Sequence, residues 1–110
     1  MAGTYQVIIT APAEQDLEDI LNYLLEEASY QKAVSAQKAI LDAIYSLTEM
    51  PTANGFVKEL IGYTNNVYRR VIAKKTYKII YQIEEQQKEV FVIRIMHVKR
   101  GPDFIKEALK

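Results

Sequence analysis

The chain has 110 residues, of which 49% are hydrophobic and 25% charged, and it contains no cysteine. This length and balance are typical of one folded domain and exclude a disordered chain, while the missing cysteines exclude disulfide bonds and thiolate metal sites. The sequence contains no apolar run near the ~20 residues of a membrane-spanning helix and no secretory signal, so we expect a cytoplasmic protein without a membrane partner.

The formal net charge is zero, but the charges are divided along the chain. Residues 1–55 carry eight acidic and two basic side chains, whereas residues 56–110 carry twelve basic and six acidic ones. A protein divided in this way can present one positive surface to a polyanion or to an acidic partner. The alternative is that folding mixes the two halves, so that opposite charges become neighbours.

The chain begins with a predicted strand that leads into a helix. Residues 5–9 combine an aromatic side chain with β-branched ones, as strands do. Thr10 then offers a hydroxyl as a helix cap, and Pro12 suits the first turn of a helix. Acidic residues between positions 14 and 19 favour the same end, because the helix dipole attracts negative charge there.

Two amphipathic helices are predicted next. Apolar residues recur every three or four positions over 13–28 and again over 33–47, and the second stripe ends before Pro51. The few residues around Ser29 allow only a tight reversal, so the helices should form an antiparallel hairpin. Four large apolar side chains lie off the second stripe and offer a further contact surface: Tyr30, Val34, Leu41 and Tyr45.

The second half of the chain is predicted to be rich in strands. Loops are expected at 51–55 and 62–66, strands at 67–73, 77–84 and 89–98, and a small helix at 103–110. The short polar turns at 74–75 and 85–88 favour antiparallel hairpins. The predicted fold is therefore α+β, in the order β-α-α-β-β-β with a short C-terminal helix, and its helical hairpin covers one sheet face.

Five short motifs follow one another along nearly the whole chain. They are Pro12-Ala13-x-x-Asp16-Leu17-x-x-Ile20-x-x-Tyr23, Leu47-x-x-x-Pro51-x-x-x-Gly55, Leu60-x-Gly62 with Tyr68-Arg69-Arg70-Val71, Tyr77-Lys78-Ile79-Ile80-Tyr81, and His97-Val98-Lys99-Arg100. In this order and spacing they resemble the RelE/ParE superfamily, the toxins of type II toxin–antitoxin systems. Each motif alone is weak, and it is their succession that makes the resemblance specific.

The resemblance implies both a partner and a target. RelE-like members cut mRNA in the ribosomal A site, and ParE-like members block DNA gyrase without cutting RNA. The partner is a cognate antitoxin, whose extended or helical segment wraps the toxin and neutralises it, and such pairs serve in growth inhibition and plasmid stabilisation. The divided charge and the spare apolar side chains are compatible with coupled folding of such a segment.

RNA cleavage would need groups that activate the ribose 2′-OH, stabilise a pentacovalent phosphate and protonate the leaving oxygen. The resemblance implies that four residues would supply these catalytic groups: Arg69, Lys78, His97 and Arg100. Lys78 replaces an arginine of the family and loses the fork that grips two phosphate oxygens at once. Phe104 stands where the family has a C-terminal tyrosine, and it has no hydroxyl for proton transfer.

These departures slightly favour a ParE-like toxin that acts by binding over an mRNA-cutting enzyme. A third alternative is a degenerate module that binds only an antitoxin-like partner. The further residues expected to contact a target or a nucleic acid are Arg70, Lys74, Lys75, Arg94 and Phe104. One histidine and scattered carboxylates provide no metal-ligand set, so neither a metal nor a cofactor is expected.

We expect the basic side chains to act from one cationic face of a curved sheet, with the helices behind it. That face would carry Arg69, Lys78, Arg94 and Arg100. Strand alternation gives Arg94 the parity of Val92 and Met96, and places His97 on the opposite face, unless a bulge intervenes. Two structural interpretations also remain open: His97 as a hydrogen-bonded residue at a strand end, and the lysine and arginine pairs as a charged sheet edge.

Overall fold

The computed structural model describes residues 4–62 and 67–109. The elements follow in the order β1 (Gln6–Ile9), α1 (Ala11–Glu27), α2 (Tyr30–Ser46), β2 (Arg69–Ala73), β3 (Tyr77–Glu84), β4 (Glu89–His97) and α3 (Pro102–Ala108). Two 3-10 turns, Pro51–Ala53 and Lys58–Leu60, connect α2 to β2. This order confirms the predicted β-α-α-β-β-β fold with its short C-terminal helix. The loop predicted at 62–66 lies outside the described residues, except for Gly62.

The four strands form one sheet in the order β1-β4-β3-β2. β1 runs parallel to β4, and the other neighbours are antiparallel. The intervening helical hairpin makes the parallel pairing possible, because parallel strands need a long crossover. β1 pairs with residues 89–92, and within residues 4–62 and 67–109 no other strand lies beside the second half of β4 on that side.

A β-bulge in β4 changes which side chains share a face. Ile80 pairs with Arg94 while Tyr81 pairs with Val92, so Ile93 is the extra residue. Val92 therefore packs with the first core cluster and Met96 with the second, although their alternation alone would place them together. The prediction that Val92, Arg94 and Met96 point to the same face of the sheet is therefore wrong, and the bulge is the reason.

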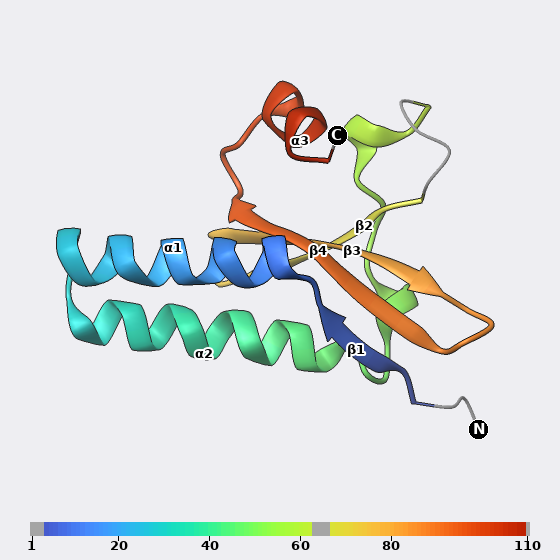
Figure 1. Ribbon diagram of the computed structural model, residues 1–110, viewed down its shortest axis with the longest axis horizontal. Helices are drawn as coiled ribbons and strands as arrows, with labels where there is room; N and C mark the ends of the chain where they lie inside the picture. Colours follow the sequence, from blue (N-terminus) through green and yellow to red (C-terminus); the bar gives the residue numbers. More distant parts are fainter. Residues whose placement is uncertain (1–3, 63–66, 110) are drawn as a thin grey trace.

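Each face of the sheet carries its own layer (Figure 1). The α1–α2 hairpin covers one face, where the larger core is built from Ala13, Ile40, Ile44, Leu47, Ala73, Ile79, Tyr81, Val90, Val92 and Ile95. α3 and the Lys58–Leu60 turn cover the other face with Val57, Leu60, Ile80, Met96 and Ile105. In the part of the chain that the structure describes, every helix is too short or too polar to span a lipid bilayer.

A β-turn over residues 73–76, with Lys74 and Lys75 at its centre, connects β2 to β3. Lys74 and Lys75 have φ values of 54° and 58°, and the Thr76 amide donates to the Ala73 carbonyl oxygen at 2.9 Å. Positive φ at both central residues is the type I′ geometry, which matches the twist of the flanking strands. Lysine is an unusual choice for this turn, since glycine and asparagine adopt such backbone angles more readily.

Candidate functional site

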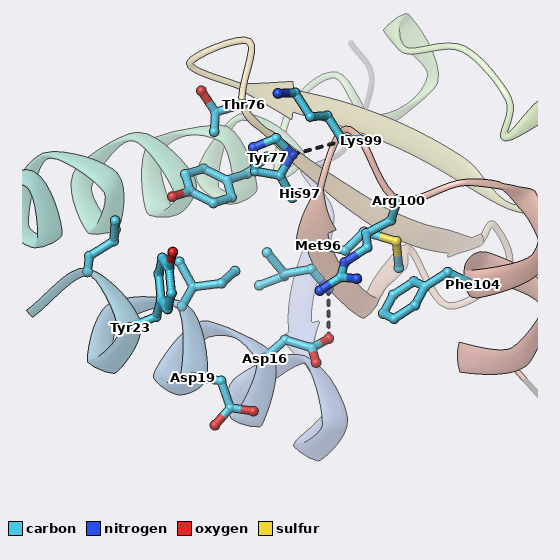
Figure 2. A pocket seen from close by; sticks show the side chains of 13 residues that line it. Asp16, Asp19, Tyr23, Thr76, Tyr77, Met96, His97, Lys99, Arg100 and Phe104 are labelled. Carbon is cyan, nitrogen blue, oxygen red and sulfur yellow. Dashed lines mark hydrogen bonds between the residues drawn. The ribbon is translucent and has the colours of Figure 1, made fainter. Parts of the chain in front are cut away.

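A pocket of about 750 Å³ opens where α1, the ends of β3 and β4, and the start of α3 meet (Figure 2). α1 contributes Asp16, Asp19, Ile20, Tyr23 and Leu24, and the other walls are Thr76, Tyr77, Ile95, Met96, His97, Lys99, Arg100 and Phe104. The pocket therefore brings together three residues that the sequence had singled out: His97, Arg100 and Phe104. Acidic side chains from α1 stand on one side of it, and basic side chains from the β4–α3 segment on the other.

His97 is the last residue of β4 and lies opposite Tyr77 of β3. The two rings meet edge to face, with centroids 6.1 Å apart and planes inclined by 75°. The Lys99 amide donates to His97 Nδ1 at 3.0 Å, so the neutral imidazole carries its proton on Nε2. Burial raises the pKa of the Tyr77 hydroxyl above its ordinary value. His97 thus has a defined structural role at the strand end.

Four exposed cations gather at this end of the sheet. The Val98 amide donates to the Thr76 carbonyl oxygen at 2.8 Å, which brings the end of β4 beside the β2–β3 turn. We call the resulting group the basic end; it consists of Lys74, Lys75, Lys99 and Arg100. The guanidinium carbon of Arg100 lies 4.6 Å from the centroid of the Phe104 ring, and Lys74 Nζ bonds Ser35 Oγ at 2.5 Å.

Arg69 lies toward the other end of β3 and holds the chain that follows α2. Its Nη1 donates to the Asn54 carbonyl oxygen at 2.6 Å, and its guanidinium carbon lies 4.2 Å from the Phe56 ring centroid. In the sheet Arg69 pairs with Tyr81, whose hydroxyl bonds the Pro51 carbonyl oxygen. Burial raises the pKa of Tyr81, against smaller opposing effects of its bond to Asn54 and of the Arg69 charge. Arg69 is therefore part of a structural corner.

Lys78 lies in the middle of the sheet. It pairs with Ile72 on one side and Met96 on the other, and its side chain is only 7% exposed. Neighbours in register share a face, and Met96 belongs to the core beneath α3, so Lys78 lies on the face that α3 covers. His97, whose partner is Tyr77, has the opposite orientation. Arg70 pairs with Ile80 and shares the face of Lys78.

Arg94 is committed to contacts within the molecule. Its Nε and Nη2 donate to the two carboxylate oxygens of Asp16, and its Nη1 donates to the Ala108 carbonyl oxygen at 3.1 Å. The hydrogen bond with Asp16 is the main cause that raises the pKa of Arg94. The guanidinium thus joins α1 to α3 at the edge of β4.

The expectation of one cationic face is wrong. Lys78 is buried, Arg94 is paired with Asp16, Arg69 holds the corner after α2, and only Arg100 lies at the pocket. The alternation of side chains along a strand could not predict where these four residues lie. It indicates neither the β-bulge in β4 nor which elements cover each face of the sheet. Lys99 and Tyr23 were missed as pocket residues, although both stand inside motifs that the sequence displayed.

Comparisons with known proteins agree with this architecture. Residues 7–102 match the family described as the ParE toxin of the type II toxin–antitoxin system parDE. A solved chromosomal ParDE toxin–antitoxin system from P. aeruginosa contains a chain of similar fold, with a TM-score of 0.71 at 16% identity, covering 89% of this chain and 100% of that one. A chain of the RelBE2 toxin–antitoxin complex from Mycobacterium tuberculosis is also similar, with a TM-score of 0.56 at 21% identity, covering 86% and 98%. The comparison with curated protein sequences found no match.

Proposed function

Because the chain belongs to the ParE toxin family of type II toxin–antitoxin systems, we propose that it inhibits growth by binding DNA gyrase in the cytoplasm and cuts no RNA itself. A cognate antitoxin would neutralise it. The names of the two solved relatives, a ParDE system and a RelBE2 complex, support such a partner. The choice of gyrase over the ribosome rests on the geometry of the basic residues.

The observation that carries the proposal is the dispersal of the groups that RNA cleavage would need. Arg69 pairs with Tyr81 and His97 with Tyr77, so their positions differ by four residues along β3, or roughly 13 Å. Lys78 lies on the opposite face of the sheet from both and is buried. A general base, a phosphate-binding cation and a general acid must instead lie within hydrogen-bonding reach of one reacting phosphate. The arrangement therefore favours binding over nuclease chemistry.

The pocket and the basic end form the surface that we assign to the target. Aromatic side chains and arginine are the groups that most often dominate protein interfaces. Tyr23 is 65% exposed and Phe104 40% exposed at this pocket, and the guanidinium of Arg100 lies over the Phe104 ring. This combination suits a protein surface that carries acidic side chains beside apolar ones.

The experiment is induction of the protein in growing cells, followed by mapping of mRNA 5′ ends and measurement of plasmid supercoiling. We expect growth arrest with intact transcripts and relaxed plasmids. Codon-phased cuts that disappear in both His97→Ala and Lys78→Ala would instead establish the nuclease. Cells that keep growing would leave only a module that binds an antitoxin-like partner.

The binding surface is tested separately by Arg100→Ala combined with Phe104→Ala. Both side chains are exposed, so the variant should fold normally and lose most of the toxicity. Lys58→Ala is the matched control, because Lys58 is an exposed base that does not line the pocket. Equal toxicity of the two variants would remove the pocket from the proposal.

A further inference from the structure

The outer face of α2 carries large apolar side chains that no other part of the described structure covers. Tyr30, Val34, Leu41 and Tyr45 are 72%, 44%, 40% and 74% exposed, whereas the buried residues of the same helix are Ala33, Ala36, Ile40 and Ile44. At 3.6 residues per turn, the four exposed side chains fall within about 60° of the helix surface. Large exposed apolar side chains gathered along one face of a helix often mark a contact surface.

The stripe has the same spacing in both directions. Four residues separate Tyr30 from Val34, seven separate Val34 from Leu41, and four separate Leu41 from Tyr45. Its midpoint lies between Gln37 and Lys38. A helix read from either end thus presents a tyrosine, an aliphatic residue, an aliphatic residue and a tyrosine. This self-complementarity is what a twofold contact between identical chains requires.

We propose that two copies of this chain associate through α2, with the two helices antiparallel and the twofold axis beside Gln37 and Lys38. Tyr30 of one copy then lies next to Tyr45 of the other, and Val34 next to Leu41, at both ends of the contact. A helix from a different protein would need no such symmetry of spacing. The proposal goes beyond the toxin function and does not depend on the target.

The charges along the stripe permit this pairing. Lys38 lies beside the axis in both copies, but its Nζ is 2.8 Å from Asp42 Oδ2 on the same helix, so each lysine brings its own counter-charge. The formal net charge of the whole chain is zero, so two copies do not repel each other at long range. A single pair of helices buries less surface than a standard interface, and the dimer is therefore weak.

The absence of cysteine from the sequence makes a cross-linking test clean. Gln37→Cys places one thiol per chain beside the axis, where the two copies come within disulfide reach. Gln31→Cys is the matched control, because it changes the same residue type on an exposed position of the same helix. In the proposed pairing its two copies are thirteen residues apart along the helices, or about 20 Å.

We expect mild oxidation to link most of the Gln37→Cys protein and little of the Gln31→Cys protein at 100 μM. Adding Leu41→Lys to Gln37→Cys should reduce the linked fraction at least fivefold, while circular dichroism and the unfolding transition stay unchanged. Sedimentation of the unmodified chain should show a dimer that dissociates on dilution. Equal cross-linking of the two cysteine variants would overturn the proposal, as would a monomer at every concentration. A monomer whose antitoxin binding is lost on Leu41→Lys would assign the stripe to the antitoxin instead.

Discussion

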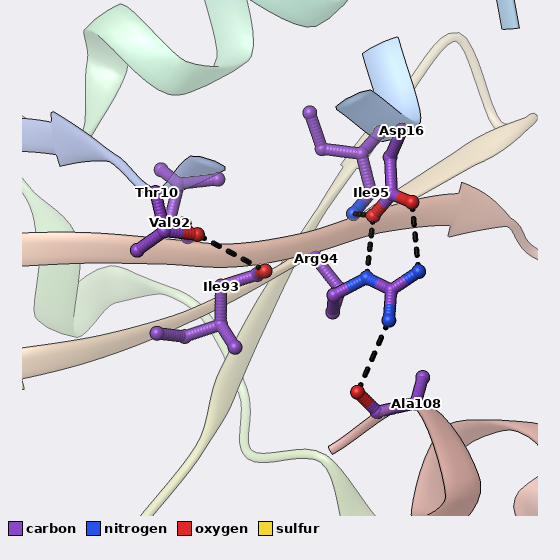
Figure 3. Close-up of polar contacts among 7 residues, drawn as sticks. All are labelled: Thr10, Asp16, Val92, Ile93, Arg94, Ile95 and Ala108. Atoms are coloured by element: carbon purple, nitrogen blue, oxygen red, sulfur yellow. Dashed lines mark hydrogen bonds and ion pairs between the residues drawn. The ribbon is translucent and has the colours of Figure 1, made fainter. Parts of the chain in front are cut away.

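The carboxylate of Asp16 accepts hydrogen bonds from Arg94 at both of its oxygens, from Nε at 2.7 Å and from Nη2 at 2.8 Å (Figure 3). It also accepts one from the Ile95 amide at 2.9 Å. Ile95 lies beyond the β4 residues that pair with β1. The Asp16 carboxylate therefore accepts the hydrogen bond from the Ile95 amide that a neighbouring strand would otherwise accept. Through the Ala108 carbonyl the same guanidinium reaches α3, and one contact thus connects the helical layers on the two sides of the sheet.

The first prediction concerns this ion pair. Asp16→Ala should lower the free energy of unfolding by about 3 kcal/mol, because it leaves a partly buried arginine charge without its partner. Asp16→Ala combined with Arg94→Met should recover part of the loss. Urea unfolding at pH 7 measures both, and Asp19→Ala is the control, because Asp19 is an exposed acid one turn further along the same helix. Equal effects of Asp16→Ala and Asp19→Ala would show that the pair contributes nothing.

The second prediction concerns the lysines of the β2–β3 turn. Lys75→Gly should raise the free energy of unfolding by about 1 kcal/mol, since Lys75 adopts a φ of 58° that glycine reaches without a steric penalty. Lys75→Ala removes the same charge but keeps the Cβ atom, so it should give no comparable gain. Thermal unfolding of the two variants separates backbone strain from charge. A gain of similar size in both would contradict the strain argument.

The third prediction is a loss of stability in alkaline solution. Burial raises the pKa of Tyr77 and Tyr81 above the ordinary value near ~10. The folded protein therefore keeps protons that the unfolded chain releases, and the free energy of unfolding should fall as the pH rises past ~10. Urea unfolding between pH 8 and 11 measures this slope. Tyr77→Phe should make the slope shallower, whereas the exposed Tyr45→Phe should not, and the reverse order would contradict the assignment.

The fourth prediction separates a structural Arg69 from a catalytic one. Arg69→Ala should lower the free energy of unfolding by about 1–2 kcal/mol, because its hydrogen bond to the Asn54 carbonyl and its contact with Phe56 are lost. Toxicity should fall only as far as the folded fraction does. Growth assays at 25 °C and 37 °C, with unfolding curves at both temperatures, make the comparison. Complete loss of toxicity in a fully folded variant would show that Arg69 takes part in the activity.

The sequence predicted the order of the elements well because each has a local cause. The apolar periods define α1 and α2, Pro12 marks the first turn of the first helix, and the turn residues between 73 and 77 separate β2 from β3. The prediction that the Thr10 hydroxyl caps this helix is wrong, because that hydroxyl donates to the Val92 carbonyl oxygen instead. The parallel pairing of β1 with β4 follows from the hairpin between them but has no local signal.

The site was predicted less well, because its chemistry depends on contacts between distant residues. Asp16 and Arg94 are 78 positions apart, and nothing in the sequence indicated that they would form an ion pair. Lys78 occupies a family position for a basic residue, yet it is buried on the sheet face that also carries α3, a helix that begins 24 residues later. His97, Arg100 and Phe104 were found because they lie close together in the sequence at the end of one strand.

The most direct test of the binding mechanism is a supercoiling assay with purified gyrase, the purified protein and, in a parallel reaction, ribosomes translating a defined mRNA. We predict that the protein inhibits supercoiling, that Arg100→Ala combined with Phe104→Ala relieves the inhibition, and that the mRNA stays intact. Undisturbed supercoiling together with cleavage of the translated mRNA would contradict the account.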